Sequence, residues 1–267
     1  MAIAEAEASF RSGDISGALR ALQQVVRSEP DKVQPRIFLA QLLMVTGDWD
    51  RAVTQLDLAA ELSVEAVPMR HTYAAAIQCE KLRESVFRGE RSPLVLGDPE
   101  PWLALLVQSI SMLAQGRVQE AAELRAQAFD QAASTAGTIN GTPFEWIADA
   151  DCRLGPVLEV LLNGSYYWVP FSRLSKVAVE PPADVRDLVW LPAQFIWSNG
   201  GEAFGLIPTR YPGSEGAEDP SIRLARRTEW RDLGDETFVG LGQRILATDA
   251  AEVGLLELRE LSLAHES

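Results

Sequence analysis

Two aspartates, a cysteine and an arginine lie within five consecutive positions of the segment WIADADCRLGP (146–156). Asp149 and Asp151 form a D-x-D pattern, which in some enzymes holds a divalent cation together with nucleotide phosphates. Such a cation needs more oxygen ligands than this short segment supplies, and no carboxylates with calcium-loop spacing follow. Arg153 is placed to pair with either aspartate in a bidentate manner. The pattern favours a structural corner held by an internal ion pair, and a metal or catalytic site and a protein contact are the alternatives.

Other residue types that do chemistry are scarce in this chain. Cys152 would be a nucleophile only beside a base, and the histidines are limited to His71 and His265. This excludes most zinc sites and most histidine-based triads. Cys79 and Cys152 are expected to be free thiols of a cytosolic protein. We expect no cofactor.

Two further segments invite a functional interpretation. SNGGE (198–202) lacks the Lys-Ser/Thr ending of a phosphate-binding loop and the helix that follows one, so it predicts a hairpin turn. PTRYPGSE (208–215) places Arg210 and Tyr211 beside an acidic loop. A guanidinium with an aromatic ring often anchors an interface, but an internal salt bridge fits the same residues, and both uses stay open.

The composition limits the classes of partner. The chain has 267 residues, of which 47% are hydrophobic and 23% charged, as in ordinary globular proteins. The formal net charge of -14 repels phosphate backbones and anionic lipids, so nucleic acid and membranes are not expected partners. No apolar run approaches the length of about 18 residues that spans a bilayer. Glu5 and Glu7 stand where a signal peptide carries basic residues, which predicts a cytoplasmic protein.

The first half of the chain has the pattern of a helical repeat. Similar segments begin at Gly13, Gly47 and Gly116, and the first two are 34 residues apart, the period of a tetratricopeptide helix pair. Glycine ends one helix, and Asp14 or Asp48 is suited to cap the next. The apolar residues after Asp14 recur at helical spacing and predict one apolar stripe: Ile15, Ala18, Leu19, Leu22, Val25 and Val26. The pattern predicts an α-solenoid of about six or seven helices, including 35–45, 71–87 and 102–114.

The second half has the pattern of short strands. Small residues, glycines and a proline over 134–144 place the domain boundary there, which gives a tetratricopeptide-like helical domain (1–136) and a smaller, β-rich α+β domain (137–267). Asn163-Gly164 predicts a two-residue hairpin. We expect a strand over 203–207, a strand with a bend at Pro192 or a strand pair over 185–197, and a helix over 248–264. The sheet is expected to be antiparallel, and either open or closed into a small barrel.

These elements favour a binding protein. A stack of helix pairs forms a curved surface that commonly holds a peptide or helix of another protein. Trp49, directly after the Gly47 turn, is a candidate for the lining of such a groove. A helical domain that only supports the second half and a metal-dependent enzyme built on Asp149, Asp151 and Arg153 are the alternatives.

Several long motifs occur in order in the second half and closely resemble the ImpE family, also called TagJ or SciE-type proteins. These motifs are FEWIADADCRLGPVLEVLLNGSYYWVPF (144–171), DVRDLVW (184–190), and NGGE with GLIPTRYPGSE (199–215). The resemblance covers nearly the whole chain, although the helical half carries less specific motifs. Cys152 stands where a serine or another small residue is expected.

The resemblance implies a non-enzymatic, cytoplasmic adaptor of type VI secretion systems. Members of the family are associated with the contractile sheath: they bind the N-terminal helix of its small subunit, TssB, and are linked to the unfoldase ClpV, an AAA+ ATPase. The residues that we single out as partner-binding or structural are Trp49, Asp149, Asp151, Arg153, Arg186, Asp187, Trp190, Arg210 and Tyr211.

Overall fold

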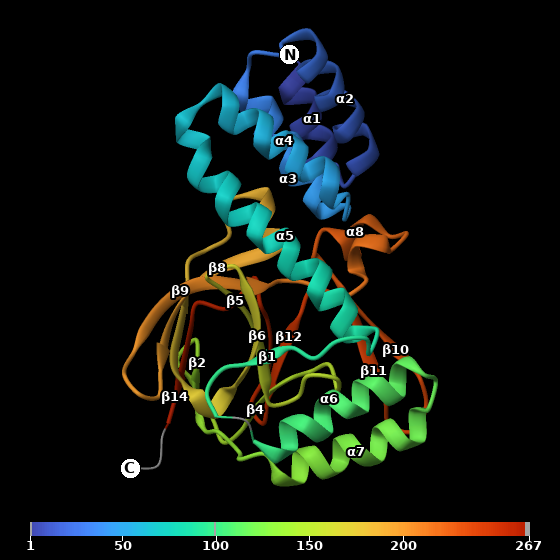
Figure 1. Cartoon of the computed structure of the whole chain (residues 1–267), viewed down its shortest axis with the longest axis vertical. Helices are drawn as coiled ribbons and strands as arrows, with labels where there is room; N and C mark the ends of the chain where they lie inside the picture. The colour runs from blue at the N-terminus through green and yellow to red at the C-terminus, as the bar shows by residue number, and fades with distance from the viewer. Residues whose placement is uncertain (1, 99, 265–267) are drawn as a thin grey trace.

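The computed structural model describes residues 2–98 and 100–264, which form a helical region followed by a β-rich domain with short helices (Figure 1). This order confirms the predicted fold class. The longer helices are α1 (Ala2–Ser12), α2 (Ile15–Ser28), α3 (Val33–Val45), α4 (Trp49–Leu62), α5 (Val67–Phe87), α6 (Pro101–Ala114) and α7 (Val118–Gln131), and the single turn α8 (Pro220–Arg223) follows later. Short 3-10 helices are η1 (Val64–Ala66), η2 (Phe171–Arg173), η3 (Val185–Leu188) and η4 (Ser214–Gly216).

The strands follow from the residue pattern of the second half, apart from β1, which lies between α5 and α6. They are β1 (Leu94–Val95), β2 (Gly137–Ile139), β3 (Thr142–Phe144), β4 (Ile147–Asp149), β5 (Val157–Leu162), β6 (Ser165–Pro170), β7 (Leu174–Val179), β8 (Trp190–Trp197), β9 (Glu202–Pro208), β10 (Thr228–Asp232), β11 (Phe238–Gly242), β12 (Ile245–Thr248), β13 (Glu252–Gly254) and β14 (Glu260–Leu263).

The turn into α2 shows how the repeat folds. Gly13 adopts a φ of 88°, which glycine tolerates without a side-chain clash. A carboxylate oxygen of Asp14 then accepts a hydrogen bond from the backbone nitrogen of Gly17 at 2.8 Å. Four residues of the predicted stripe of α2 are buried, and Leu19 and Val26 are partly buried against the same core. The second repeat differs in one respect: Asp48 makes no side-chain cap and pairs with Arg51 instead, at 2.6 Å.

The helices form two groups on different sides of the β-rich domain (Figure 1). The α1–α5 stack begins at one end of the molecule, and its last helix, α5, runs across the sheet domain toward α6; the α6–α7 pair packs beside β10 and β11. From α7, Arg125 donates a hydrogen bond to the Thr237 hydroxyl at 3.1 Å, and Phe129 lies against Gly155. The α6–α7 pair is therefore fixed by the sheet domain together with the end of α5, whose Val86 belongs to the same core as Trp102 of α6.

The main sheet of the described residues has the order β1-β6-β5-β9-β8-β7-β14-β2-β3 and is antiparallel except for β1, which runs parallel to β6. This order begins at β1 and ends at β3 without closure, so the sheet is open. The β5–β6 hairpin turns at Asn163 and Gly164, whose φ angles are 49° and 76°, as the sequence predicts. The turn over 198–202 and the strand through Ala203–Ile207 are also confirmed. Smaller sheets pair β10 with β11, and β12 with β13 and β4.

The helix predicted over 248–264 is wrong. This segment forms β13 and β14, and β14 lies between β7 and β2 in the main sheet. Leu261 and Leu263 point into the core of the sheet, while the intervening Ser262 is less buried. Leucine at mixed three- and two-residue spacings fits a helix and a strand alike, and the neighbouring strands decide the outcome because they supply the hydrogen-bond partners.

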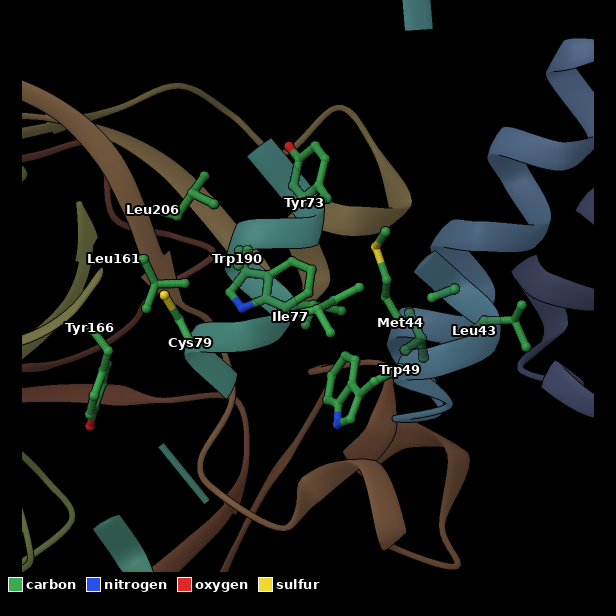
Figure 2. Packing of buried hydrophobic residues seen from close by; sticks show 14 of the residues in the cluster. Leu43, Met44, Trp49, Tyr73, Ile77, Cys79, Leu161, Tyr166, Trp190 and Leu206 are labelled. Atoms are coloured by element: carbon green, nitrogen blue, oxygen red, sulfur yellow. The ribbon is translucent and has the colours of Figure 1, made fainter. Parts of the chain in front are cut away.

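Two hydrophobic cores result from this arrangement. One lies inside the curled sheet and the other joins the α1–α5 stack to the outer face of the sheet. Figure 2 shows this second core, where Trp190 and Leu206 of the sheet lie against Tyr73, Ile77 and Cys79 of α5. In the described part of the chain, no helix has both the length and the apolar character needed to cross a membrane.

Candidate functional site

The D-x-D segment forms a closed corner at the end of β4. Asp149 is 3% exposed and Asp151 0%. Arg153 binds Asp151 with two nitrogens, Nε to Oδ1 at 2.9 Å and Nη2 to Oδ2 at 2.5 Å. The backbone nitrogen of Gly240 donates to the same Oδ2 at 2.8 Å. The predicted pairing of Arg153 with an aspartate is therefore present, and both oxygens of Asp151 are occupied by donors of the protein itself.

Asp149 has a different partner, which the sequence analysis did not identify. Arg244 is fully buried, and its Nε and Nη2 contact one oxygen of Asp149 at 2.9 and 2.7 Å. The other oxygen accepts hydrogen bonds from the Tyr211 hydroxyl at 3.0 Å and the Asp151 backbone nitrogen at 2.9 Å. Burial raises the pKa of Asp149 to about 6, although the charge of Arg244 opposes this rise.

Glu159 is the centre of the buried charges. It lies on β5 within the apolar run VLEVLL and is 0% exposed. Arg83 of α5 binds both of its oxygens, at 2.7 and 2.8 Å, and Arg244 approaches at 3.2 Å. Burial alone would raise the pKa of Glu159, but the two guanidinium groups outweigh it and lower the pKa to about 2. Glu159 is thus an ionised link between α5, β5 and the residue directly before β12.

The aromatic residues around Glu159 extend this cluster. The hydroxyl of Tyr166 donates to Glu159, and the indole nitrogen of Trp168 donates to that hydroxyl at 2.7 Å. Glu80 of α5 contacts Arg83 at 3.4 Å and accepts a hydrogen bond from the Trp190 indole nitrogen at 2.8 Å. We call the whole cluster the junction network; it comprises Glu80, Arg83, Asp149, Asp151, Arg153, Glu159, Tyr166, Trp168, Trp190, Arg210, Tyr211 and Arg244.

Arg210 connects the network to the end of the repeat stack. Its Nη1 donates to the carbonyl oxygens of Val45 at 2.8 Å and Arg223 at 2.5 Å, and its own carbonyl oxygen accepts from Arg83 at 2.8 Å. Val45 is the last residue of α3, and Arg223 is the last residue of α8. Cations at helix C-termini complete unpaired carbonyls and oppose the helix dipole. Burial lowers the pKa of Arg210 to about 10, which leaves it charged at neutral pH.

The DVRDLVW motif completes the junction. Trp190 lies between Trp49 and Tyr73, with ring centroids 5.9 Å from each (Figure 2). The guanidinium of Arg186 lies 5.0 Å from the Tyr73 ring centroid. Asp187 accepts hydrogen bonds from the backbone nitrogens of residues 183 and 184, both at 2.8 Å. Trp49 is 9% exposed, so it contributes to the core of the junction and not to an open groove surface.

The sheet domain also contacts the stack at α3 and at the end of α1. Gln41 of α3 donates to Asp184 at 2.8 Å, and Arg226 donates to the carbonyl oxygens of Phe10 and Arg11 at the end of α1. Together with the contacts of Trp190 and Arg210, these interactions occupy the side of the stack that faces the sheet. A partner of the helical region therefore has to approach from another side.

The cysteines are not activated by their surroundings. Burial raises the pKa of Cys79 to about 11, and burial likewise raises the pKa of Cys152. His71 lies on the exposed start of α5, and His265 lies outside the described residues. Within residues 2–98 and 100–264, no three or more histidine, cysteine or acidic side chains group together in a way suited to hold a metal ion.

The sequence analysis missed Glu80, Arg83, Glu159 and Arg244. A usable signal existed for Glu159, because an ionised residue inside a continuous apolar strand requires a buried partner. Its partners, Arg83 on α5 and Arg244 just before β12, are separated from it by 76 and 85 residues in the chain, and no local spacing connects them.

The fold and the junction define a class of protein in which a tetratricopeptide-type helical region is bound to a β-rich domain through buried ion pairs. A family model for the tetratricopeptide repeat matches residues 9–66, and the model described as ImpE protein matches residues 141–262. The chain is 49% identical over 256 residues to the type VI secretion system accessory component TagJ of Pseudomonas aeruginosa, which covers 96% of this chain and 90% of that protein. The chain belongs to the ImpE family, which confirms the resemblance.

A solved structure shows the same fold. The crystal structure of a protein from Vibrio parahaemolyticus superposes with a TM-score of 0.89, covers 98% of each chain and has 24% sequence identity. The whole arrangement of helical region and sheet domain is therefore shared at low sequence identity.

Proposed function

We propose that this protein is a non-enzymatic, cytoplasmic adaptor of a type VI secretion system. In this proposal it binds the N-terminal helix of the small sheath subunit TssB and connects the sheath to the unfoldase ClpV. The relationship to an accessory component of such a system, at 49% identity over nearly the whole chain, is the observation that carries the proposal.

The state of the reactive residues supports a role without catalysis. Asp149 and Asp151 are buried and bound by Arg244, Arg153, Tyr211 and backbone nitrogens. A catalytic or metal-binding carboxylate needs an open side for its substrate or ion. The alternative of a metal-dependent enzyme built on this corner would require the protein to break its own buried ion pairs first.

The helical region and the charge of the protein support the choice of partner. Tetratricopeptide-type surfaces commonly hold helices or peptides of other proteins. The net charge of -14 favours a basic partner segment and disfavours nucleic acid.

Isothermal titration calorimetry of the full-length protein with a peptide of the TssB N-terminal helix tests the proposal. We expect saturable one-site binding, and no binding of a control peptide in which the same residues are shuffled so that the apolar face is lost. Absence of heat and of peptide retention with the folded protein would refute the adaptor role. ClpV is then tested by pull-down with and without TssB: retention in at least one of the two mixtures supports the link, and loss from both refutes it.

A further inference from the structure

The outer face of the β8–β9 hairpin is covered along only part of its length. Residues opposite each other in antiparallel strands place their side chains on the same face. The register pairs Pro192 with Leu206, Gln194 with Phe204, and Ile196 with Glu202, so these residues share the face that also carries Trp190. Trp190 is 0% exposed and Leu206 8%, whereas Phe204 is 73% exposed. The helical layer that covers this face at Trp190 therefore ends before Phe204.

Two hollows flank Phe204, and they share Phe204 and Gly205 as a common wall. The first has a volume of about 410 Å³ and lies between β8–β9 and the loop before η3, where Pro181, Leu191 and Pro192 form apolar walls. The second has a volume of about 390 Å³ and lies between β9, the β5–β6 turn and α5. Figure 2 shows three of its lining residues together, Leu161 and Leu206 from the sheet and Cys79 from α5.

On the α5 side, small side chains line most of the second hollow. Thr72, Ala75, Ala76 and Cys79 lie there at helical spacing, together with the exposed His71. Small side chains at such positions let the backbone of a second helix approach closely, and an exposed phenylalanine supplies the contact that fixes its position. A helix that lies across Phe204 would continue the layer that α5 begins.

The charges around the two hollows favour a partner segment with basic residues. Among the described residues that line the hollows, Glu180, Asp184 and Asp187 are acidic, and Arg186 is the one arginine. Arg186 is already paired with Asp184 at 3.0 Å. Glu180 is exposed at the edge of the first hollow, and Glu202 is exposed beyond Phe204. The rim therefore complements a segment that carries basic residues beside its apolar ones.

The two hollows and the exposed ring between them form what we call the Phe204 surface. We propose that this surface is the docking site for the amphipathic partner helix. Apolar side chains of that helix lie in the hollows on either side of Phe204, and its basic residues face Glu180 and Glu202. This assignment rests on the proposed function, because that proposal supplies the helical partner. It places the contact on the sheet domain and the first half of α5, away from the side of the stack that the junction occupies.

The test compares three variants of the full-length protein with the wild type, using the same TssB peptide with a fluorescent label. Phe204→Ala removes the central ring. Glu180→Lys reverses a rim charge. Phe238→Ala is the matched control, because Phe238 is an exposed phenylalanine on β11 of the β-rich domain and is 46% exposed. Circular dichroism and the melting temperature verify that each variant is folded.

We expect Phe204→Ala to weaken binding at least ~10-fold, as truncation of a central aromatic anchor does, while Phe238→Ala stays within about twofold of the wild type. Glu180→Lys should slow association and flatten its salt dependence. Hydrogen exchange should show new protection at residues 192–196 and 202–206 on peptide binding.

The outcomes separate the surface from the function. If the wild type binds the peptide and Phe204→Ala binds equally well, the docking surface is wrong and the adaptor role stands. If the wild type does not bind, both proposals fail. Equal binding of a peptide whose helix is broken by proline, or a dimer in light scattering that Phe204→Ala dissociates, would assign the surface to an extended segment or to a second copy of the chain and overturn the helical occupant.

Discussion

The two ends of the β8–β9 hairpin each place an aromatic residue on the same face of the sheet, but one of these residues is buried and the other is exposed. At one end Trp190 is enclosed by Trp49, Tyr73 and Glu80, and at the other end Phe204 projects from the surface. The difference arises from where α5 and η3 cross the sheet, since the strand pattern of the hairpin continues through both ends. The covered end serves to join the two parts of the protein, and the bare end is available for another molecule.

The same contrast applies to the charged residues. The acids of the D-x-D corner look reactive in the sequence, but they are bound by arginines from distant elements inside the protein. No motif in the sequence marks the acidic residues at the rim of the Phe204 surface, but the side chains of Glu180 and Glu202 are exposed to solvent. A conspicuous cluster of chemistry-bearing residues is therefore a poor guide to the binding surface when its charges are already satisfied.

The largest effect is expected at the covered end of the hairpin. Trp190→Ala removes a fully buried indole and one hydrogen-bond donor to Glu80, and such truncations cost about 3–5 kcal/mol of the free energy of unfolding. Urea unfolding followed by tryptophan fluorescence and circular dichroism measures it. A loss below about 1 kcal/mol would show that the stack and the sheet are not joined through this residue.

Breaking the centre of the junction network should be nearly as costly. Glu159→Gln leaves Arg83 and Arg244 buried with one carboxylate fewer, and removal of one partner of a buried pair costs about 3 kcal/mol or more. The matched control is Glu120→Gln, which removes an exposed pair with Arg117 and should cost far less, because solvent screens both charges. Equal losses in the two variants would contradict the importance of burial.

The pH dependence of stability tests whether Arg83 and Arg244 hold Glu159 in its ionised form. The pKa of Glu159 is about 2 in the folded protein against an ordinary value of 4.5, so the unfolded chain binds the proton more readily between these values. Ionised Glu159 therefore contributes roughly 3 kcal/mol to the free energy of unfolding above pH 4.5. This contribution is lost as the pH falls toward 2.

Unfolding of the wild type and of Glu159→Gln at several pH values from 5 to about 2.5 measures the difference in slope. The wild type should lose stability more steeply, because the variant has no group at this position to protonate. Asp149 shares Arg244 with Glu159, so the difference between the two proteins reports the coupled titration of these two carboxyls. Parallel curves would mean that Glu159 is not held ionised by Arg83 and Arg244.

A moderate effect is expected at the link between the network and the repeats. Arg210→Met keeps most of the apolar stem and removes the hydrogen bonds to the carbonyl oxygens of Val45 and Arg223. Hydrogen bonds from a charged donor are each worth about 1.5–3 kcal/mol, so we expect a loss of about 2 kcal/mol or more, with faster hydrogen exchange at the end of α3. Unchanged exchange there would show that Arg210 does not hold this helix end.

The smallest effect on stability is expected at the bare end. Phe204→Ala removes a side chain that is 73% exposed and should change the free energy of unfolding by less than about 0.5 kcal/mol. The same urea experiment applies. A loss comparable to that of Trp190→Ala would mean that Phe204 is a structural residue, and the comparison between the two ends would no longer hold.

Local patterns were sufficient for most of the fold. The glycine turn and the Asp14 cap predict the start of α2, and Asn163-Gly164 predicts the β5–β6 hairpin, because each depends on backbone angles and neighbours within a few residues. The final segment was predicted as a helix because its leucines fit both periods. The hydrogen bonds of β7 and β2 to β14 decide its structure, and these come from residues far away in the chain.

The candidate site could be predicted only where its contacts are local in the chain. The pairing of Arg153 with an aspartate two residues away follows from the sequence, because both groups lie on one short corner. The partners of Asp149 and Glu159 do not, since Arg244 and Arg83 reach them only when α5 and β12 pack on β4 and β5. The exposure of Phe204 was equally hidden, because an alternating strand pattern gives the face of a residue but not whether another element covers that face.

By itself the sequence determined the order of a helical half and a β-rich half, the net negative charge and the membership of a family, since these depend on composition, short-range geometry and long motifs in order. Only the tertiary structure decided which charges are neutralised and which aromatic residue is left uncovered. The reason is that burial and electrostatic partners are properties of three-dimensional distance. Here Asp149 and Arg244 meet across 95 positions of the chain, and Arg210 and the Val45 carbonyl meet across 165.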